Sequence, residues 1–111
     1  MKLSNRKFEL IENEAGLASE KTLMVFDNSS HPYKASYSGP NVKYGHIIVS
    51  TDKSETIMLY HSLSKDGDLA AGRAKVTLKE INSSTTEMQL HWHWLTGDLS
   101  SGISKWSEIN A

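Results

Sequence analysis

Residues 85–103 read TTEMQLHWHWLTGDLSSGI, and the first half of this stretch alternates strictly between apolar and polar side chains. The apolar set consists of Met88, Leu90, Trp92 and Trp94. The polar set between them consists of Gln89, His91 and His93. A period of two is typical of an antiparallel strand with one buried face. Because Gly97-Asp98 then forms a turn signal, the stretch predicts two strands joined by a hairpin turn.

The same period recurs along the rest of the chain and predicts eight strands. They cover residues 7–13, 22–27, 32–38, 42–50, 55–62, 69–78, a strand that begins at 85, and 102–109. Turn signals separate them, and Asp66-Gly67 is of the type that most strongly indicates a hairpin. Residues 14–21 favour helix but are too few for more than a turn or two, so they predict a loop.

Short connections between successive strands favour pairing of sequence neighbours. Eight such strands can close into a barrel, which removes the exposed edges that an open sheet has. The alternative to a closed barrel is a sandwich of two sheets. Small residues on one strand, Ala70, Gly72 and Ala74, lie beside bulky Trp92 and Trp94 on the next, which suits a tightly curved wall. The sequence thus predicts an all-β fold, an eight-stranded antiparallel up-and-down meander that closes into a small barrel, in one domain over residues 1–111.

Composition excludes several classes of function. The chain has 111 residues, a net charge of −1 and 12 scattered Lys and Arg residues, so nucleic-acid binding is not expected. It has no Cys, which fits a reducing compartment. No signal-peptide core and no apolar run of membrane-spanning length is present, so we expect a cytoplasmic protein without a membrane partner. The sequence leaves open whether it is a monomer or a homodimer.

Three segments carry a resemblance to a known family. They are ASYSG at 35–39, YHSLSKDGDLAAGRA at 60–74 and LHWHWLTGDLSSG at 90–102. Together they resemble a family of small uncharacterised bacterial proteins of about this length, whose members often carry the label "N-acetylglutamate synthase". The W-x-W-x-x-G-D-x-S-S-G pattern is the most specific part. The resemblance implies a lipocalin-type or calycin-like barrel and no established activity.

That label conflicts with the chemistry that the sequence offers. An acetyltransferase of this kind needs a backbone cradle for the pyrophosphate of acetyl-CoA, formed by a glycine-rich turn that opens a helix. The chain contains no such turn followed by a helix, and it also lacks a nucleophile elbow and a dinucleotide fingerprint. We therefore interpret the label as a misattribution, and we expect neither an enzymatic activity nor a cofactor.

Two histidines could bind a metal. His91 and His93 stand two residues apart, so both project from one face of a strand, as paired zinc ligands do. A third ligand would have to come from His46, His61 or Glu108. The sequence favours two histidines that face solvent over a metal-dependent enzyme.

The interior of the predicted barrel offers the main functional hypothesis. Trp92, Trp94 and Trp106 either fill the core or line a cavity for a ligand. Strand parity places four polar groups on the same inner surface, where they could orient a ligand: Tyr37, His61, Ser104 and Glu108. A buried Glu108 would need a cationic partner such as Arg73 or a histidine.

The leading prediction is a protein that binds a small hydrophobic or aromatic ligand inside the barrel. The alternative is a structural or protein-interaction module with a filled core, which would present Tyr60, His91 and His93 on its outer surface.

Overall fold

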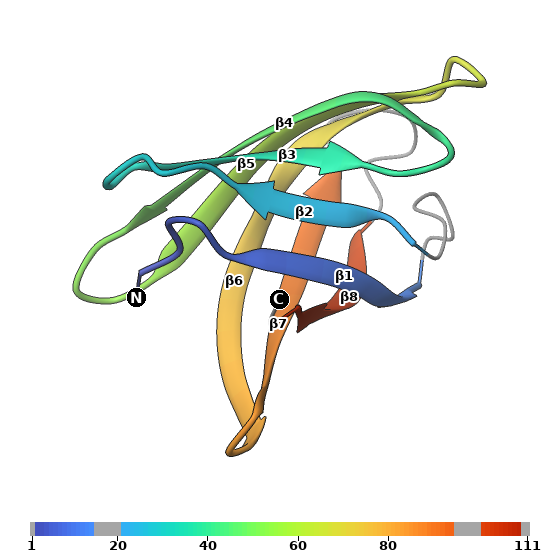
Figure 1. Cartoon of the computed structure of the whole chain (residues 1–111). Helices are drawn as coiled ribbons and strands as arrows, with labels where there is room; N and C mark the ends of the chain where they lie inside the picture. The colour runs from blue at the N-terminus through green and yellow to red at the C-terminus, as the bar shows by residue number, and fades with distance from the viewer. Residues whose placement is uncertain (1, 15–20, 95–100, 110–111) are drawn as a thin grey trace.

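The computed structural model describes residues 2–14, 21–94 and 101–109, with Trp94 described only in its backbone. Over these residues the chain forms eight antiparallel strands that close into a barrel in sequence order, with the last strand pairing with the first (Figure 1). The strands are β1 Lys7–Asn13, β2 Leu23–Phe26, β3 Tyr33–Ser38, β4 Val42–Thr51, β5 Thr56–Ser64, β6 Leu69–Asn82, β7 Thr85–Trp94 and β8 Ser101–Glu108. The predicted all-β meander and its closure are confirmed.

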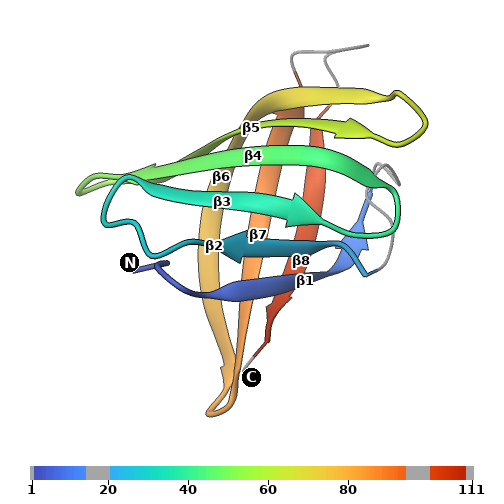
Figure 2. The ribbon, with the colours of Figure 1, turned by 45° about the horizontal axis from the view of Figure 1, so that its top comes forward.

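The described residues include no helix long and apolar enough to cross a membrane. Two expectations, a short helix within residues 14–21 and the turn at Gly97-Asp98, concern segments that lie largely outside the described residues. The largest departure from the predicted bounds is in β6, which runs to Asn82. Its last residues pair with the start of β7, so that the β6–β7 hairpin projects from one end of the barrel (Figure 2).

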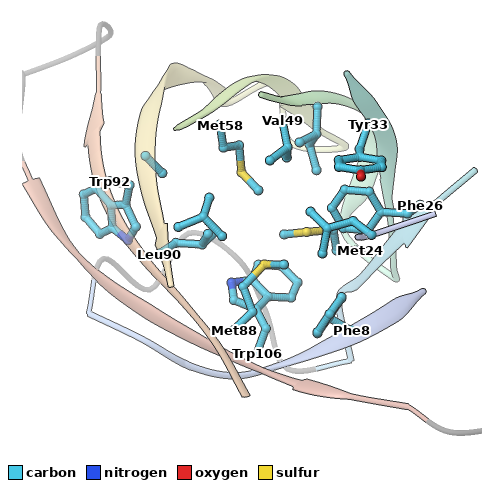
Figure 3. Close-up of a cluster of buried hydrophobic side chains, with 14 of the residues drawn as sticks. Phe8, Met24, Phe26, Tyr33, Val49, Met58, Met88, Leu90, Trp92 and Trp106 are labelled. Atoms are coloured by element: carbon cyan, nitrogen blue, oxygen red, sulfur yellow. The ribbon is translucent and has the colours of Figure 1, made fainter. Parts of the chain in front are cut away.

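One half of the barrel interior is solidly packed. Residues with essentially no solvent exposure come from several strands and meet at its centre (Figure 3): Phe8, Met24, Val49, Met58 and Met88. The rings of Phe8 and Phe26 meet edge to face with centroids 6.2 Å apart. Leu3, ahead of β1, is also fully buried. We call this half of the barrel, where β1 begins and β8 ends, the closed end.

Two interior glycines make room for aromatic rings. A Cβ built on Gly45 of β4 would lie 2.6 Å from Cδ2 of Tyr37, and one built on Gly102 of β8 would overlap the indole of Trp92. Gly102 and Trp92 are direct partners across β7 and β8. Near Gly45, the register of β4 against β5 shifts between Val42 and Tyr44.

The predicted inner face of β5 is wrong. The sequence predicts that His61 lies on the inner surface. The structure instead buries Thr56 and Met58 and turns Tyr60 into the barrel, while Leu59 is 54% exposed and His61 is exposed. Pairing explains the difference, since Met58 and Tyr60 lie opposite the buried Val49 and Ile47 of β4.

Candidate functional site

A cavity of about 100 Å³ occupies the other half of the barrel, which we call the open end. It lies where β3 ends, β4 begins, β5 ends and β6 begins. The residues that line it are Asn13, Thr22, Tyr37, Asn41, Val42, Tyr60, Ser62, Leu63, Ser64, Asp68, Ala70, Leu90, Trp92, Ser104 and Trp106. A single water needs about 10–15 Å³, so the cavity is several times larger than a water site.

Aromatic rings form much of the cavity wall. Tyr37 of β3 and Trp106 of β8 stack with centroids 5.6 Å apart and planes inclined by 14°. Strands β1 and β2 separate β3 from β8 in the sheet, so these two rings meet across the barrel interior. The indole Nε1 of Trp106 donates a hydrogen bond of 3.0 Å to the buried Oγ of Ser104. Trp92 contributes a further ring, seated against Gly102.

Two phenols supply hydrogen-bond donors. The hydroxyl of Tyr60 is buried and has no hydrogen-bond partner among the described residues. Burial raises the pKa of Tyr60 well above its usual value of 10.0. Burial, together with a smaller effect of nearby Tyr60, likewise raises the pKa of Tyr37. Both phenols therefore stay protonated at neutral pH and act as neutral donors.

The charge in the cavity lies at its mouth. Asp68 is the one ionisable acid or base other than the phenols among the described lining residues. Its backbone is fixed to the end of β5, because its N–H donates to Oγ of Ser64 and its carbonyl accepts from the N–H of Ser64, both at 2.9 Å. The inner part of the described wall is thus uncharged, and the mouth carries one carboxylate.

Several lining residues were missed by sequence reasoning. Tyr60 lies on the face of β5 opposite to the predicted inner face, and it lines the cavity. Asn13 lines the cavity because β1 shifts register against β8 between Leu10 and Glu12, which turns Asn13 inward. Thr22 lies just before β2, at even spacing from the buried Met24 and Phe26, and this spacing is a signal that could have found it.

Four of the seven candidate ligand-binding residues line the cavity: Tyr37, Trp92, Ser104 and Trp106. The backbone of Trp94 pairs with Gly72, and its side chain lies outside the described part of the structure. His61 does not belong to the cavity, since it lies on the outer face of β5 beside the ring of Tyr44.

Glu108 shares the inner face of β8 with Ser104 and Trp106 but lies at the closed end. Its Oε2 and Oε1 accept hydrogen bonds from Nε and Nη2 of Arg6, each at 2.7 Å. The prediction that Arg73 or a histidine pairs with Glu108 is therefore wrong. The hydrogen bonds from Arg6 hold the pKa of Glu108 below its ordinary value of 4.5. The guanidinium also lies 5.4 Å from the ring centroid of Phe8, so this pair helps to close the barrel end.

The histidines cover the outer wall. His91 and His93 are exposed on β7 with ring centroids 5.5 Å apart, and His46 and His61 face each other across β4 and β5. Strand β6 separates the two pairs. Among the described residues, no group of three or more His, Cys, Asp or Glu side chains could hold a metal ion.

Comparison with known proteins agrees with this architecture. The family model described as "Avidin-like protein" matches residues 1–109, which is nearly the whole chain. No curated protein and no solved structure gave a significant match. With an eight-stranded closed barrel and a family match over its length, the chain belongs to the avidin-like protein family.

Proposed function

We propose that the protein binds one small, largely apolar or aromatic ligand in the cavity at the open end of the barrel. The observation that supports this proposal is the cavity of about 100 Å³ walled by Tyr37, Trp92 and Trp106. A cavity of about 150 Å³ in another protein takes up benzene, so the cavity of about 100 Å³ here limits the enclosed part of a ligand to a single ring, with any substituents extending toward the mouth. The cavity favours this function over the alternative of a filled core.

The fold supports the same proposal. An eight-stranded barrel is about wide enough to be filled by side chains or to hold one small ligand, as in lipocalins and streptavidin. This barrel combines both arrangements, because its closed end is filled and its open end holds the cavity. Biotin is included among the probes because the chain belongs to the avidin-like protein family and because biotin binds tightly to streptavidin, another barrel protein. Its two fused rings and its carboxylate should suit this cavity less well than a single uncharged ring does.

Calorimetric titration tests the proposal with a matched pair of variants. Ala70 and Ala71 are neighbours on β6, but Ala70 lines the cavity and Ala71 points outward opposite His61. The probes are biotin and a set of single-ring aromatic compounds. We expect at least one probe to bind the wild type and the Ala71→Phe variant, and to lose most of its affinity for Ala70→Phe, whose added ring takes up cavity space.

Two results would oppose the proposal. One is the absence of binding by every probe to the wild-type protein. The other is equal affinity for the wild type and a folded Ala70→Phe variant, which would place the ligand elsewhere. Thermal unfolding of both variants serves as the control for folding.

A further inference from the structure

We infer that the cavity selects uncharged aromatic ligands that carry a hydrogen-bond acceptor, and that it rejects the corresponding anions. This inference rests on the proposed ligand-binding function and names the chemical class that the site takes. It combines two observations from different depths of the cavity. The wall contains a hydrogen-bond donor that has no partner among the described residues, and the described residues at the mouth include an acid but no base.

The donor is the hydroxyl of Tyr60. On β5, Tyr60 follows the fully buried Met58 and precedes Ser62 and Ser64, which lead to the mouth. Four residues of extended strand place the backbone of Tyr60 ~14 Å from that of Ser64. A buried hydroxyl without a partner is costly to a folded protein. Tyr60 lines the cavity, and a small shift of its ring toward the cavity would let an acceptor atom on the inner end of a ligand supply the partner that the described residues do not.

The other polar groups around the inner cavity favour an acceptor as well. Tyr37 is a second protonated phenol, and its ring is fixed by stacking on Trp106. Oγ of Ser104 already accepts a hydrogen bond from Trp106, which leaves its own proton to donate. The flat rings of Tyr37 and Trp106 suit an aromatic ligand, since such rings gain from stacked or edge-to-face contact.

The charge distribution argues against an anion. None of the described lining residues is a Lys, Arg or His, and Asp68 is held at the mouth by its two backbone hydrogen bonds to Ser64. Arg6, a cation of the barrel end, is engaged with Glu108 at the opposite, closed end. An anion that entered the cavity would lose its hydration without gaining an opposite charge, and it would pass the carboxylate of Asp68.

The test compares two probes of nearly equal shape, benzamide and benzoate, at neutral pH by calorimetry or ligand-observed NMR. Both contain a ring with a planar substituent, but only benzoate is charged. We expect benzamide to bind at least about tenfold more tightly, because an unpaired anion is costly to desolvate. Benzoate that binds as tightly as benzamide, or tighter, would overturn the inference.

Two variants test separately the hydrogen bond donated by Tyr60 and the repulsion of anions by Asp68. Tyr60→Phe should lower the affinity for benzamide several-fold, since it removes the donor and keeps the ring. Asp68→Asn should lower the ratio of the benzamide affinity to the benzoate affinity, because it removes the negative charge at the mouth. Asp66→Asn is the matched control, because Asp66 is an exposed acid of the same loop that does not line the cavity. In this variant the ratio of the benzamide affinity to the benzoate affinity should equal that of the wild type.

Failure of this inference is distinguishable from failure of the proposed function. If no probe binds at all, including biotin, both fail. If another probe binds in the cavity, as judged by Ala70→Phe, while benzamide does not bind, the function stands and the selectivity is wrong. An unchanged benzamide affinity in a folded Tyr60→Phe variant would likewise overturn the assignment of Tyr60 as the donor.

Discussion

Tyr37 and Trp106 come from strands that are not neighbours in the sheet, yet their rings stack with centroids 5.6 Å apart. This contact spans the barrel interior and marks the boundary between its two halves. Toward the closed end, the side chains of Met24, Met58 and Met88 are fully buried. Toward the open end lies the cavity, which both rings line. The stacked pair therefore links the stability of the barrel to the shape of the site.

The first prediction concerns this stacked pair. Trp106→Ala should lower the free energy of unfolding by about 3–5 kcal/mol, because it removes a large buried ring and leaves a void. Trp106→Phe should cost clearly less, since it keeps a ring against Tyr37. Urea unfolding followed by circular dichroism measures both values. Equal losses in the two variants would show that the stacked ring contributes little.

A second prediction concerns Gly102. Gly102→Ala should destabilise the barrel by about 1–3 kcal/mol, as overpacking does, because its Cβ would overlap the indole of Trp92. The control is Ser101→Ala, at a neighbouring exposed position of β8. The strain should be relieved in the double variant Gly102→Ala with Trp92→Leu, so the two effects should not add. Additive losses in the unfolding free energy would contradict the close contact.

The third prediction is a pH dependence that arises at the closed end. The pKa of Glu108 is lowered in the folded protein by Arg6, so the pair stabilises the fold above the ordinary value of 4.5. That contribution is lost as the pH falls through the lowered pKa. The pair is partly exposed, so Glu108→Gln should cost only about 1 kcal/mol at pH 7. The difference from the wild type should shrink as the pH falls below the ordinary value.

Glu12→Gln is the control for that experiment. Glu12 lies 3.8 Å from Nζ of Lys105 in a pair whose side chains are more exposed, so its loss should change the unfolding free energy little. If Glu108→Gln lowered the unfolding free energy by the same amount at low and at neutral pH, the ion pair with Arg6 would be ruled out as the source of the pH dependence.

A fourth prediction concerns stability at the site itself. Tyr60→Phe should leave the unfolding free energy unchanged or raise it by up to about 1 kcal/mol, because it removes a buried hydroxyl that lacks a partner in the described residues. A loss of more than 1 kcal/mol would show that the hydroxyl is already bonded in the free protein. A stable variant with weaker ligand binding is the combination expected of a residue retained for binding.

The sequence predicted the barrel well because most of its strands have one apolar face. In β7, Met88, Leu90 and Trp92 alternate with polar residues, so the pattern gives both the strand and its inner face. Strand β5 has apolar residues on both faces, and there only the pairing of Met58 with Val49 decides which side is buried. A single strand read by itself does not contain that information.

The site was less accessible to prediction than the fold. Parity placed Glu108 on the inner face of β8, but parity gives the face and not the depth, and Glu108 lies at the closed end beside Arg6. The register shift in β1 that turns Asn13 inward depends on pairing with β8. Tyr37, Trp92 and Trp106 could be predicted because large aromatic residues at even spacing favour an interior position.

The most direct test of the central claim is an NMR titration with benzamide that follows the indole N–H signals of Trp92 and Trp106. These two side chains line the cavity, whereas His46 and His61 lie on the outer wall. We predict saturable shifts of both indole signals, with the imidazole signals unmoved. Shifts confined to the outer histidines, or no saturable shift with benzamide, biotin or any of the other single-ring probes, would contradict a ligand-binding barrel.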